Sequence, residues 1–177
     1  MGFLCLLLKK HGYQAVWGKP QPFKFAKSAM HTSTGLNGRP GGVAIVARSH
    51  IPMQFVPPGD CPIRKRLYHS CRWVHAVLAY GNCKQALHVF SLYGFTGHYS
   101  HSKVADLNEA LLQDVLEVIT QLGPDAPVLV LGDINVEPDA SPVLSHAIAK
   151  GILVDLGFNT GPTFFPRMVK HAAWMLH

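Results

Sequence analysis

Short apolar runs, separated by glycine, proline and polar residues, dominate the first half of the chain and predict β-strands. Residues 41–48, GGVAIVAR, predict a buried strand that residues 53–56 continue. Two longer runs, residues 67–80 and 85–93, flank a Gly-Asn pair and therefore predict an antiparallel hairpin. Ahead of these strands, residues 4–16 predict the end of a helix that leads into a short strand.

A different spacing of apolar residues in the second half of the chain predicts helices. In residues 102–123 they recur at three- and four-residue steps, so the face that packs on a sheet consists of Val104, Leu107, Leu111, Val115, Val118 and Leu122. Residues 141–151, which open with Ser-Pro, predict a second helix. Residues 127–131 predict a strand buried on both faces, and residues 152–156 predict a short strand. This alternation of strands and helices predicts an α/β fold in which helices cover the faces of the sheet.

Polarity switches abruptly at the end of the strand at residues 127–131. Gly132 permits a sharp turn, and Asp133 and Asn135 follow it with one apolar residue between them. If the strand geometry continues to Asn135, both polar side chains point to the same side. The carboxyl end of a central strand is where α/β sheets gather their chemistry. The same residue types also favour ordinary turns, so an ordinary turn is the alternative.

Composition and charge narrow the class of protein. The 177 residues are 48% hydrophobic, which suits one domain with a sizeable core, and no tract approaches transmembrane length. The four cysteines lack zinc-finger spacing, and we expect reduced thiols in an intracellular protein, with a disulfide between two of them as the alternative. Residues 1–103 hold 13 Lys and Arg but one acid, whereas residues 104–177 hold three Lys and Arg and nine acids. This asymmetry favours a polyanionic partner and carboxylates around a metal, with a merely solvated surface as the alternative.

Taken in order, several of these segments resemble the endonuclease/exonuclease/phosphatase superfamily of metal-dependent phosphoesterases. They are GVAIV at 42–46, the strand ending in Tyr93, the amphipathic helix at 102–123, VLVLGDIN at 128–135, LVDL at 153–156 and GPTF at 161–164. The resemblance covers nearly the whole chain. It implies a four-layer α-β-β-α sandwich, in which two packed mixed β-sheets are covered by helices.

The resemblance also implies roles for individual residues. Asp133 would orient or deprotonate the attacking water, and Asn135 would hold that water or the phosphoryl oxygens. Either residue would contact a second metal position, with Mg²⁺ or Mn²⁺ as the ion, and the family's principal metal ligand is a Glu. Tyr93 would contact the scissile phosphate, and Thr163 is a further candidate for substrate binding. The alternatives are a strand-end aromatic at Tyr93 and a turn residue at Asn135.

Two parts of the family pattern are missing from this sequence. The family places an Asn and a metal-binding Glu before the first helix, but here no Glu precedes Glu109. The family closes with Ser-Asp-His, but His177 follows Leu176, so that role is not transferred to it. We therefore expect residues 1–177 to form a single domain that is incomplete at both ends and impaired or inactive as an enzyme.

The sequence thus predicts a metal-dependent phosphoesterase, with a phosphodiesterase or endonuclease acting on nucleic acid as the first choice because of the basic first half. Inositol-phosphate or lipid phosphoesterases and deadenylases are alternatives within the family. An inactive remnant or binding module of the same fold is a further alternative, as is a generic α/β domain with a chance Gly-Asp-x-Asn. No protein partner is implied, and nucleus and cytoplasm are not distinguished.

Overall fold

Two β-sheets, packed face to face, form the centre of the structure. The computed structural model describes residues 2–20, 42–79, 86–96, 102–156 and 172–175. The smaller sheet pairs β1 (Tyr13–Trp17) antiparallel with β2 (Ala44–Arg48). The larger sheet has six strands in the order β3-β4-β5-β6-β8-β7, and of its neighbouring pairs only β5 and β6 run parallel. Its strands are β3 (Met53–Phe55), β4 (Trp73–Leu78), β5 (Leu87–Tyr93), β6 (Val128–Asp133), β7 (Val154–Asp155) and β8 (Ala172–Met175).

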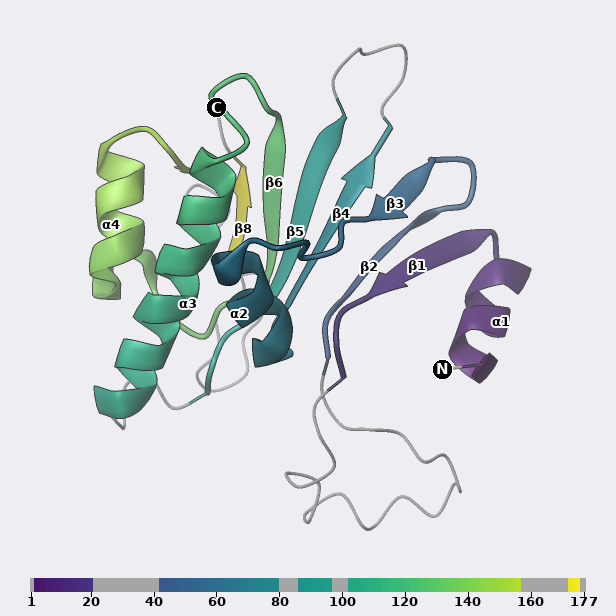
Figure 1. Cartoon of the computed structure of the whole chain (residues 1–177), viewed down its shortest axis with the longest axis horizontal. Helices are drawn as coiled ribbons and strands as arrows, with labels where there is room; N and C mark the ends of the chain where they lie inside the picture. Colours follow the sequence, from purple (N-terminus) through teal and green to yellow (C-terminus); the bar gives the residue numbers. More distant parts are fainter. Residues whose placement is uncertain (1, 21–41, 80–85, 97–101, 157–171, 176–177) are drawn as a thin grey trace.

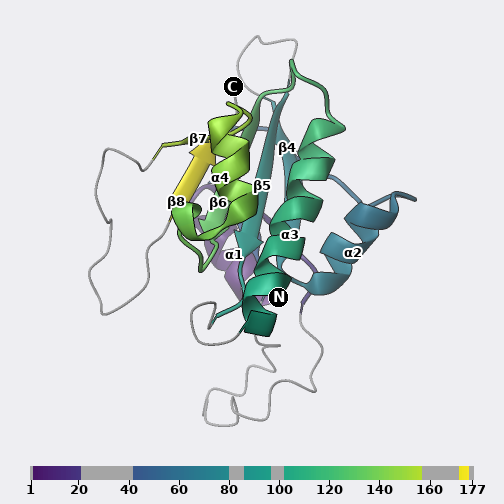
Figure 2. The same ribbon diagram turned by 90° about the vertical axis from the view of Figure 1, so that its left-hand side faces the viewer.

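Helices cover the outer face of each sheet, as Figure 1 shows edge-on. Helix α1 (Gly2–Lys10) lies against β1, outside the smaller sheet. Helices α2 (Pro62–Ser70), α3 (Ser102–Thr120) and α4 (Pro142–Ala149) cover the outer face of the larger sheet, where they face the viewer in Figure 2. A short 3-10 helix, η2 (Pro138–Ala140), leads into α4. The layers are therefore helix, sheet, sheet and helices, which confirms the predicted four-layer α/β sandwich.

The hydrophobic core has two layers because the central strands β4, β5 and β6 are covered on both faces. The layer between the larger sheet and its helices includes Trp73, Phe90 and Val128. The layer between the two sheets includes Val74 and Val89. Successive strand residues point to opposite faces, so neighbours such as Trp73 and Val74 enter different layers. This explains why these strands read as continuous apolar runs in the sequence.

Helix α3 buries a face slightly different from the predicted one. Leu111, Val115 and Val118 are buried as expected, but Leu107 is 48% exposed. The next residue, Asn108, is 1% exposed instead. Its side chain accepts a hydrogen bond from Phe95 N at 2.7 Å and donates one to Phe95 O at 3.0 Å. A polar side chain takes the buried position because the segment after β5 offers both partners.

Two predictions about the first half of the chain are wrong. Residues 53–55 do not continue β2, because β3 pairs with β4 in the other sheet. Residues 67–70 are not strand, because they complete helix α2, which starts at Pro62 and ends where Cys71 takes the left-handed conformation (φ 61°). Proline at the first position of a helix is favourable, since its missing N–H would have no partner in the helix. The four-residue strand β8 was not predicted.

The remaining predicted elements are confirmed within the described residues. Strands β4 and β5 pair antiparallel as the predicted hairpin, although the Gly-Asn pair at 81–82 lies outside the described part. Ser141 caps helix α4, since its Oγ accepts a hydrogen bond from Leu144 N at 3.1 Å. None of the described helices combines the length and the apolar character needed to cross a bilayer.

Candidate active site

Tyr93 and Asp133 lie side by side where the parallel strands β5 and β6 end, at the lower edge of the sandwich in Figure 1. The two residues are partners in the strand register, and Gly94 N donates a hydrogen bond to Asp133 O at 2.7 Å. Tyr93 packs against the layer between the two sheets, as do Leu129 and Leu131 of β6. Because side chains alternate along a strand, Asp133 points to that same face. The edge thus places a phenol and a carboxylate together.

The turn after β6 brings Asn135 to the same edge by a route that the sequence did not predict. The strand ends at Asp133, and Asn135 takes the left-handed conformation (φ 57°), which asparagine tolerates better than most residues. The strand geometry therefore does not continue to Asn135. Its side chain instead reaches β5, where Asn135 Nδ2 donates to Gly94 O at 3.2 Å. Asn135 therefore lies in a turn, the alternative that its sequence allowed, and its side chain contacts the residue that follows Tyr93.

The turn depends on close contact between two backbones. Gly132 has a φ of 148°, and a Cβ added there would lie 2.0 Å from Leu92 O. A Cβ added to Gly94 would lie 1.9 Å from Ile134 O. Gly132 in β6 and Gly94 directly after β5 therefore let the two segments approach each other. This contact fixes Asp133 and Asn135 relative to Tyr93.

Asp133 has an oxygen with no partner in the described part of the chain. Its Oδ1 atom is buried and makes no hydrogen bond there. Asn135 uses its amide nitrogen for Gly94 O, which leaves the amide oxygen for another ligand. A buried acceptor without a hydrogen-bond partner is unfavourable unless a water, an ion or a substrate binds to it. The edge is therefore suited to a group that donates hydrogen bonds or carries positive charge.

Arg72, just before β4, is a residue of this edge that the sequence analysis missed. Its Nη1 donates to Tyr93 O at 3.2 Å and to Gly94 O at 2.7 Å. The guanidinium carbon lies 5.2 Å from the centre of the Tyr93 ring and 4.0 Å from that of the Phe95 ring. Burial lowers the pKa of the Arg72 guanidinium, against smaller opposing effects of Tyr93 and Cys71. One signal was available, since Arg72 is a lone charge directly before a buried strand.

The order of these segments along the chain matches a known family. The model of the "Endonuclease/Exonuclease/phosphatase family" matches residues 4–175. The chain belongs to this family. A search of the curated proteins finds no match.

Solved structures of the family share the fold. The human Nocturnin catalytic domain, solved with a bound sulfate anion, is 19% identical with a TM-score of 0.65, and the match covers 99% of this chain and 65% of that domain. The endonuclease domain of TRAS1, a telomere-specific non-LTR retrotransposon, is 13% identical with a TM-score of 0.59, with coverages of 94% and 66%. The mannosyl-6-phosphatase of Bacteroides thetaiotaomicron is 14% identical with a TM-score of 0.56, with coverages of 96% and 66%. The chain thus spans just under two thirds of each of these structures.

Members of the endonuclease/exonuclease/phosphatase family hydrolyse phosphoester bonds and generally use divalent metals. The described residues of this chain contain no group of three His, Cys, Asp or Glu side chains that could hold a metal ion. Asp133 nevertheless fits as one ligand, because Mg²⁺ is often held by one or two carboxylates together with waters and substrate phosphate. Its buried Oδ1 without a hydrogen-bond partner agrees with that use. Thr163 lies outside the described residues.

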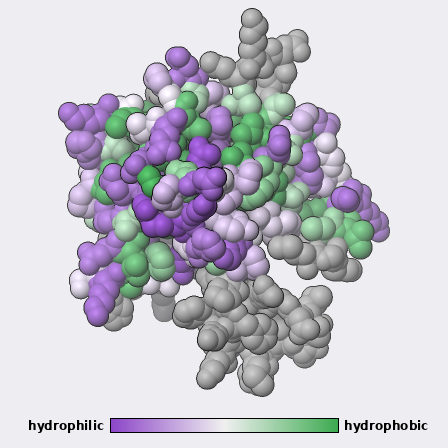
Figure 3. Space-filling model, viewed as in Figure 1, coloured by the Kyte–Doolittle hydropathy of each residue, from purple (hydrophilic) through white to green (hydrophobic). Residues whose placement is uncertain are grey.

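Two other features of the fold do not belong to this site. The basic run Arg64–Arg66 lies on α2, where hydrophilic residues gather at the centre of the face in Figure 3. Arg66 pairs with Asp114 at 2.7 Å and Lys65 with Asp60 at 3.0 Å, so both charges are matched by acids.

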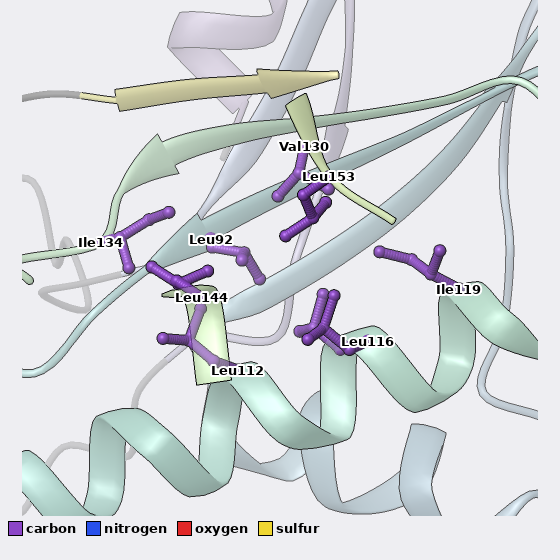
Figure 4. Close-up of a pocket in the computed structure, with 9 residues that line it drawn as sticks. Leu92, Leu112, Leu116, Ile119, Val130, Ile134, Leu144 and Leu153 are labelled. Carbon is purple, nitrogen blue, oxygen red and sulfur yellow. The ribbon is translucent and has the colours of Figure 1, made fainter. Parts of the chain in front are cut away.

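A cavity of about 10 Å³ between the larger sheet and the helices is lined by apolar side chains alone, and Figure 4 shows them. They are Leu92, Leu112, Val115, Leu116, Ile119, Val130, Ile134, Leu144 and Leu153.

Proposed function

We propose that this chain is a phosphodiesterase of the endonuclease/exonuclease/phosphatase family that acts on nucleic acid. The observation that carries the proposal is the meeting of Tyr93, Asp133 and Asn135 at one edge, where Asp133 keeps a buried oxygen without a partner in the described residues. A carboxylate in that state is suited to hold and deprotonate a water molecule. The proposal thus assigns to these three residues the roles that the sequence predicted.

The proposed reaction is in-line attack of water on phosphorus. Asp133 accepts a proton from the water as the new P–O bond forms, and the bond to the leaving alkoxide breaks on the opposite side. The leaving alkoxide takes up a proton from solvent. The Asn135 amide oxygen orients the water, and the Tyr93 hydroxyl donates to a phosphoryl oxygen. Positioning and electrostatic stabilisation account for most of the catalysis in phosphoryl transfer of this kind.

Mg²⁺ or Mn²⁺ is the proposed cofactor, with Asp133 and the Asn135 amide oxygen among its ligands. When bound, such an ion would supply positive charge to stabilise negative charge on the phosphoryl oxygens and the leaving oxygen. The described residues supply only a partial ligand set, so the ion also requires waters, the substrate phosphate and further ligands.

Nucleic acid is the proposed substrate because of the charge distribution. Residues 1–103 contain 13 Lys and Arg but one acid, which favours a polyanion. The TRAS1 domain is an endonuclease and the Bacteroides protein a sugar phosphatase, so the shared fold does not select the substrate. Cleavage and binding of DNA or RNA should weaken steeply with salt if backbone phosphates are contacted.

The decisive experiment compares Asp133→Asn with Asp139→Asn in a Mg²⁺-dependent cleavage assay on labelled DNA and RNA oligonucleotides. Asp139 is an exposed acid of η2, so its substitution makes the same change in charge outside the site. We expect Asp133→Asn to reduce the cleavage rate by about 10²-fold or more, as is common when a positioned acid or base is removed. Equal and measurable rates in the two variants would exclude Asp133 from the reaction.

A binding module without activity is the second candidate, and it is favoured by the partial metal-ligand set within the described residues. It predicts salt-dependent nucleic-acid binding by the wild-type chain with no cleavage of any phosphoester. Inositol phosphates, lipid phosphodiesters and poly(A) belong in the same assay, because the alternatives within the family differ in substrate.

A further inference from the structure

Arg72 holds a positive charge beside the proposed site without a matching negative charge in the described part of the chain. No described carboxylate lies within 4.0 Å of its guanidinium; the ion pairs of the described arginines and lysines involve Arg66 and Lys65. Arg72 is half-buried, and its partners are two neutral carbonyls and two aromatic rings. By contrast, Arg66 on the nearby helix α2 has a carboxylate partner in Asp114.

This environment is unfavourable for a side chain whose only role is structural. Burial disfavours the charged form of a guanidinium, and carbonyls and rings replace only part of the lost hydration. The contacts to the Tyr93 and Phe95 rings, at 5.2 and 4.0 Å, offset only part of that loss. A neutral donor could bridge the carbonyls of Tyr93 and Gly94 without placing a positive charge there. The positive charge therefore points to an anion that the described residues do not supply.

The position of Arg72 identifies where such an anion would bind. Arg72 Nη1 and Asn135 Nδ2 both donate to the same atom, Gly94 O, at 2.7 and 3.2 Å. The guanidinium is therefore next to the side chain of Asn135 and in contact with the Tyr93 ring. Its Nε and Nη2 atoms make no hydrogen bond to another described residue, and neither is a buried atom without a partner. These N–H groups remain available at the edge that carries Asp133.

We propose that Arg72 is a substrate-binding residue that holds a phosphate group of the substrate beside Asp133 and Asn135. The planar guanidinium matches the geometry of phosphate oxygens, with two parallel N–H donors. Its Nη1 contacts and the two rings fix the group in advance, so little freedom is lost on binding. The link to Asp133 rests on the proposed function, whereas phosphate binding by Arg72 does not.

The test measures binding of inorganic phosphate by calorimetry to the full 177-residue chain, in the presence of a chelator so that no metal contributes. Arg72→Gln keeps an amide donor for the carbonyls of Tyr93 and Gly94 but lacks the charge. Arg48→Gln is the matched control. The guanidinium of Arg48 also lies over a tyrosine ring, that of Tyr13 at 4.4 Å, but Arg48 belongs to the smaller sheet and not to the edge that carries Asp133. We expect Arg72→Gln to weaken phosphate binding about ten- to hundredfold and Arg48→Gln to change it less than twofold. Arg72→Lys, which keeps the charge, should recover part of the loss.

Three results would overturn the inference: no phosphate binding by the wild-type chain, equal affinities of wild type and Arg72→Gln, or equal losses in Arg72→Gln and Arg48→Gln. If Arg72→Gln does not fold, Arg72→Lys serves as the test. Lysine lacks the two parallel N–H donors of a guanidinium, so this variant should still bind phosphate more weakly than wild type. Asp133→Asn separates this inference from the proposed function. That variant should bind phosphate at least as tightly as wild type. A chain that binds phosphate through Arg72 but cleaves no phosphoester would refute the proposed function and leave the inference about Arg72 intact.

Discussion

Replacing Asn108 by alanine should destabilise the fold more than a substitution at an exposed helix position. The helical pattern of the sequence places Asn108 on the solvent-facing side of α3, but the structure buries it. The substitution removes two hydrogen bonds to Phe95, at 2.7 and 3.0 Å, and leaves both backbone groups without these partners. Each partly buried group left unpaired costs about 1–3 kcal/mol, and water reaching Phe95 would reduce that penalty. We expect a loss of roughly 2–4 kcal/mol in the free energy of unfolding, measured as a lower urea midpoint at an unchanged slope.

Leu107→Ala is the control for this prediction because the helical pattern assigns Leu107, not Asn108, to the core. Leu107 is 48% exposed, and alanine favours helices, so we expect a change within about 0.5 kcal/mol. A larger loss from Leu107→Ala than from Asn108→Ala would refute the reasoning and restore the helix orientation read from the sequence. A loss under about 1 kcal/mol for Asn108→Ala would show that the contacts to Phe95 contribute little.

Two further predictions concern stability. Burial, followed by repulsion from His88 and Arg64, lowers the pKa of His75 to about 3, so the folded state stays neutral while the unfolded state takes up a proton below about 6.5. Stability is therefore complete above pH 6.5 and is lost as the pH falls toward 3. Urea titrations should show a loss of roughly 2 kcal/mol from pH 7 to 5, which His75→Leu reduces and exposed His50→Leu does not. Gly94→Ala should lower the free energy of unfolding by more than about 3 kcal/mol, since the new Cβ would lie 1.9 Å from a backbone oxygen. Gly151→Ala is the control, because Gly151 has open space around it and a φ of 68°, and it should lose about 1–2 kcal/mol. Equal losses in the two variants would contradict the steric argument.

Much of the fold follows from hydrophobic spacing, because strands covered on both faces and a long amphipathic helix leave strong patterns. Helix α2 was missed because its nine residues include one buried side chain, Leu67, which is too little for a periodic signal. Strand β8 was missed because its four residues become a strand by pairing with β6 and β7. The separation of β3 from β2 likewise depends on partners distant in the sequence. Such pairings are set by tertiary contacts, which a local pattern does not contain.

The candidate site likewise contains residues that the local sequence indicates and one residue that depends on tertiary contacts. Asp133 and Asn135 were singled out because Gly-Asp-x-Asn follows a buried strand, whereas Tyr93 was named through the resemblance to the family. The only sequence signal for Arg72 is its place as a lone charge before a buried strand, because its contact with Tyr93 depends on the antiparallel register that pairs Trp73 with Leu92. The roles of these residues in catalysis stay predictions until the variants are measured.

The segment Tyr93–Phe95 explains why the site residues can be held in place at an open edge. Every backbone N–H and C=O group of these three residues has a partner. Tyr93 N donates to Arg72 O, Gly94 N donates to Asp133 O, and Asn108 takes both groups of Phe95. Arg72 and Asn135 share the carbonyl of Gly94, and Arg72 also reaches that of Tyr93. A segment fixed by four residues from different parts of the chain loses little entropy when a ligand binds, so the chemistry proposed here needs no rearrangement of the backbone. The same argument predicts that damage to any one of these contacts moves Tyr93 relative to Asp133, and that stability and phosphate binding fall together in Asn108→Ala but separate in Arg72→Gln.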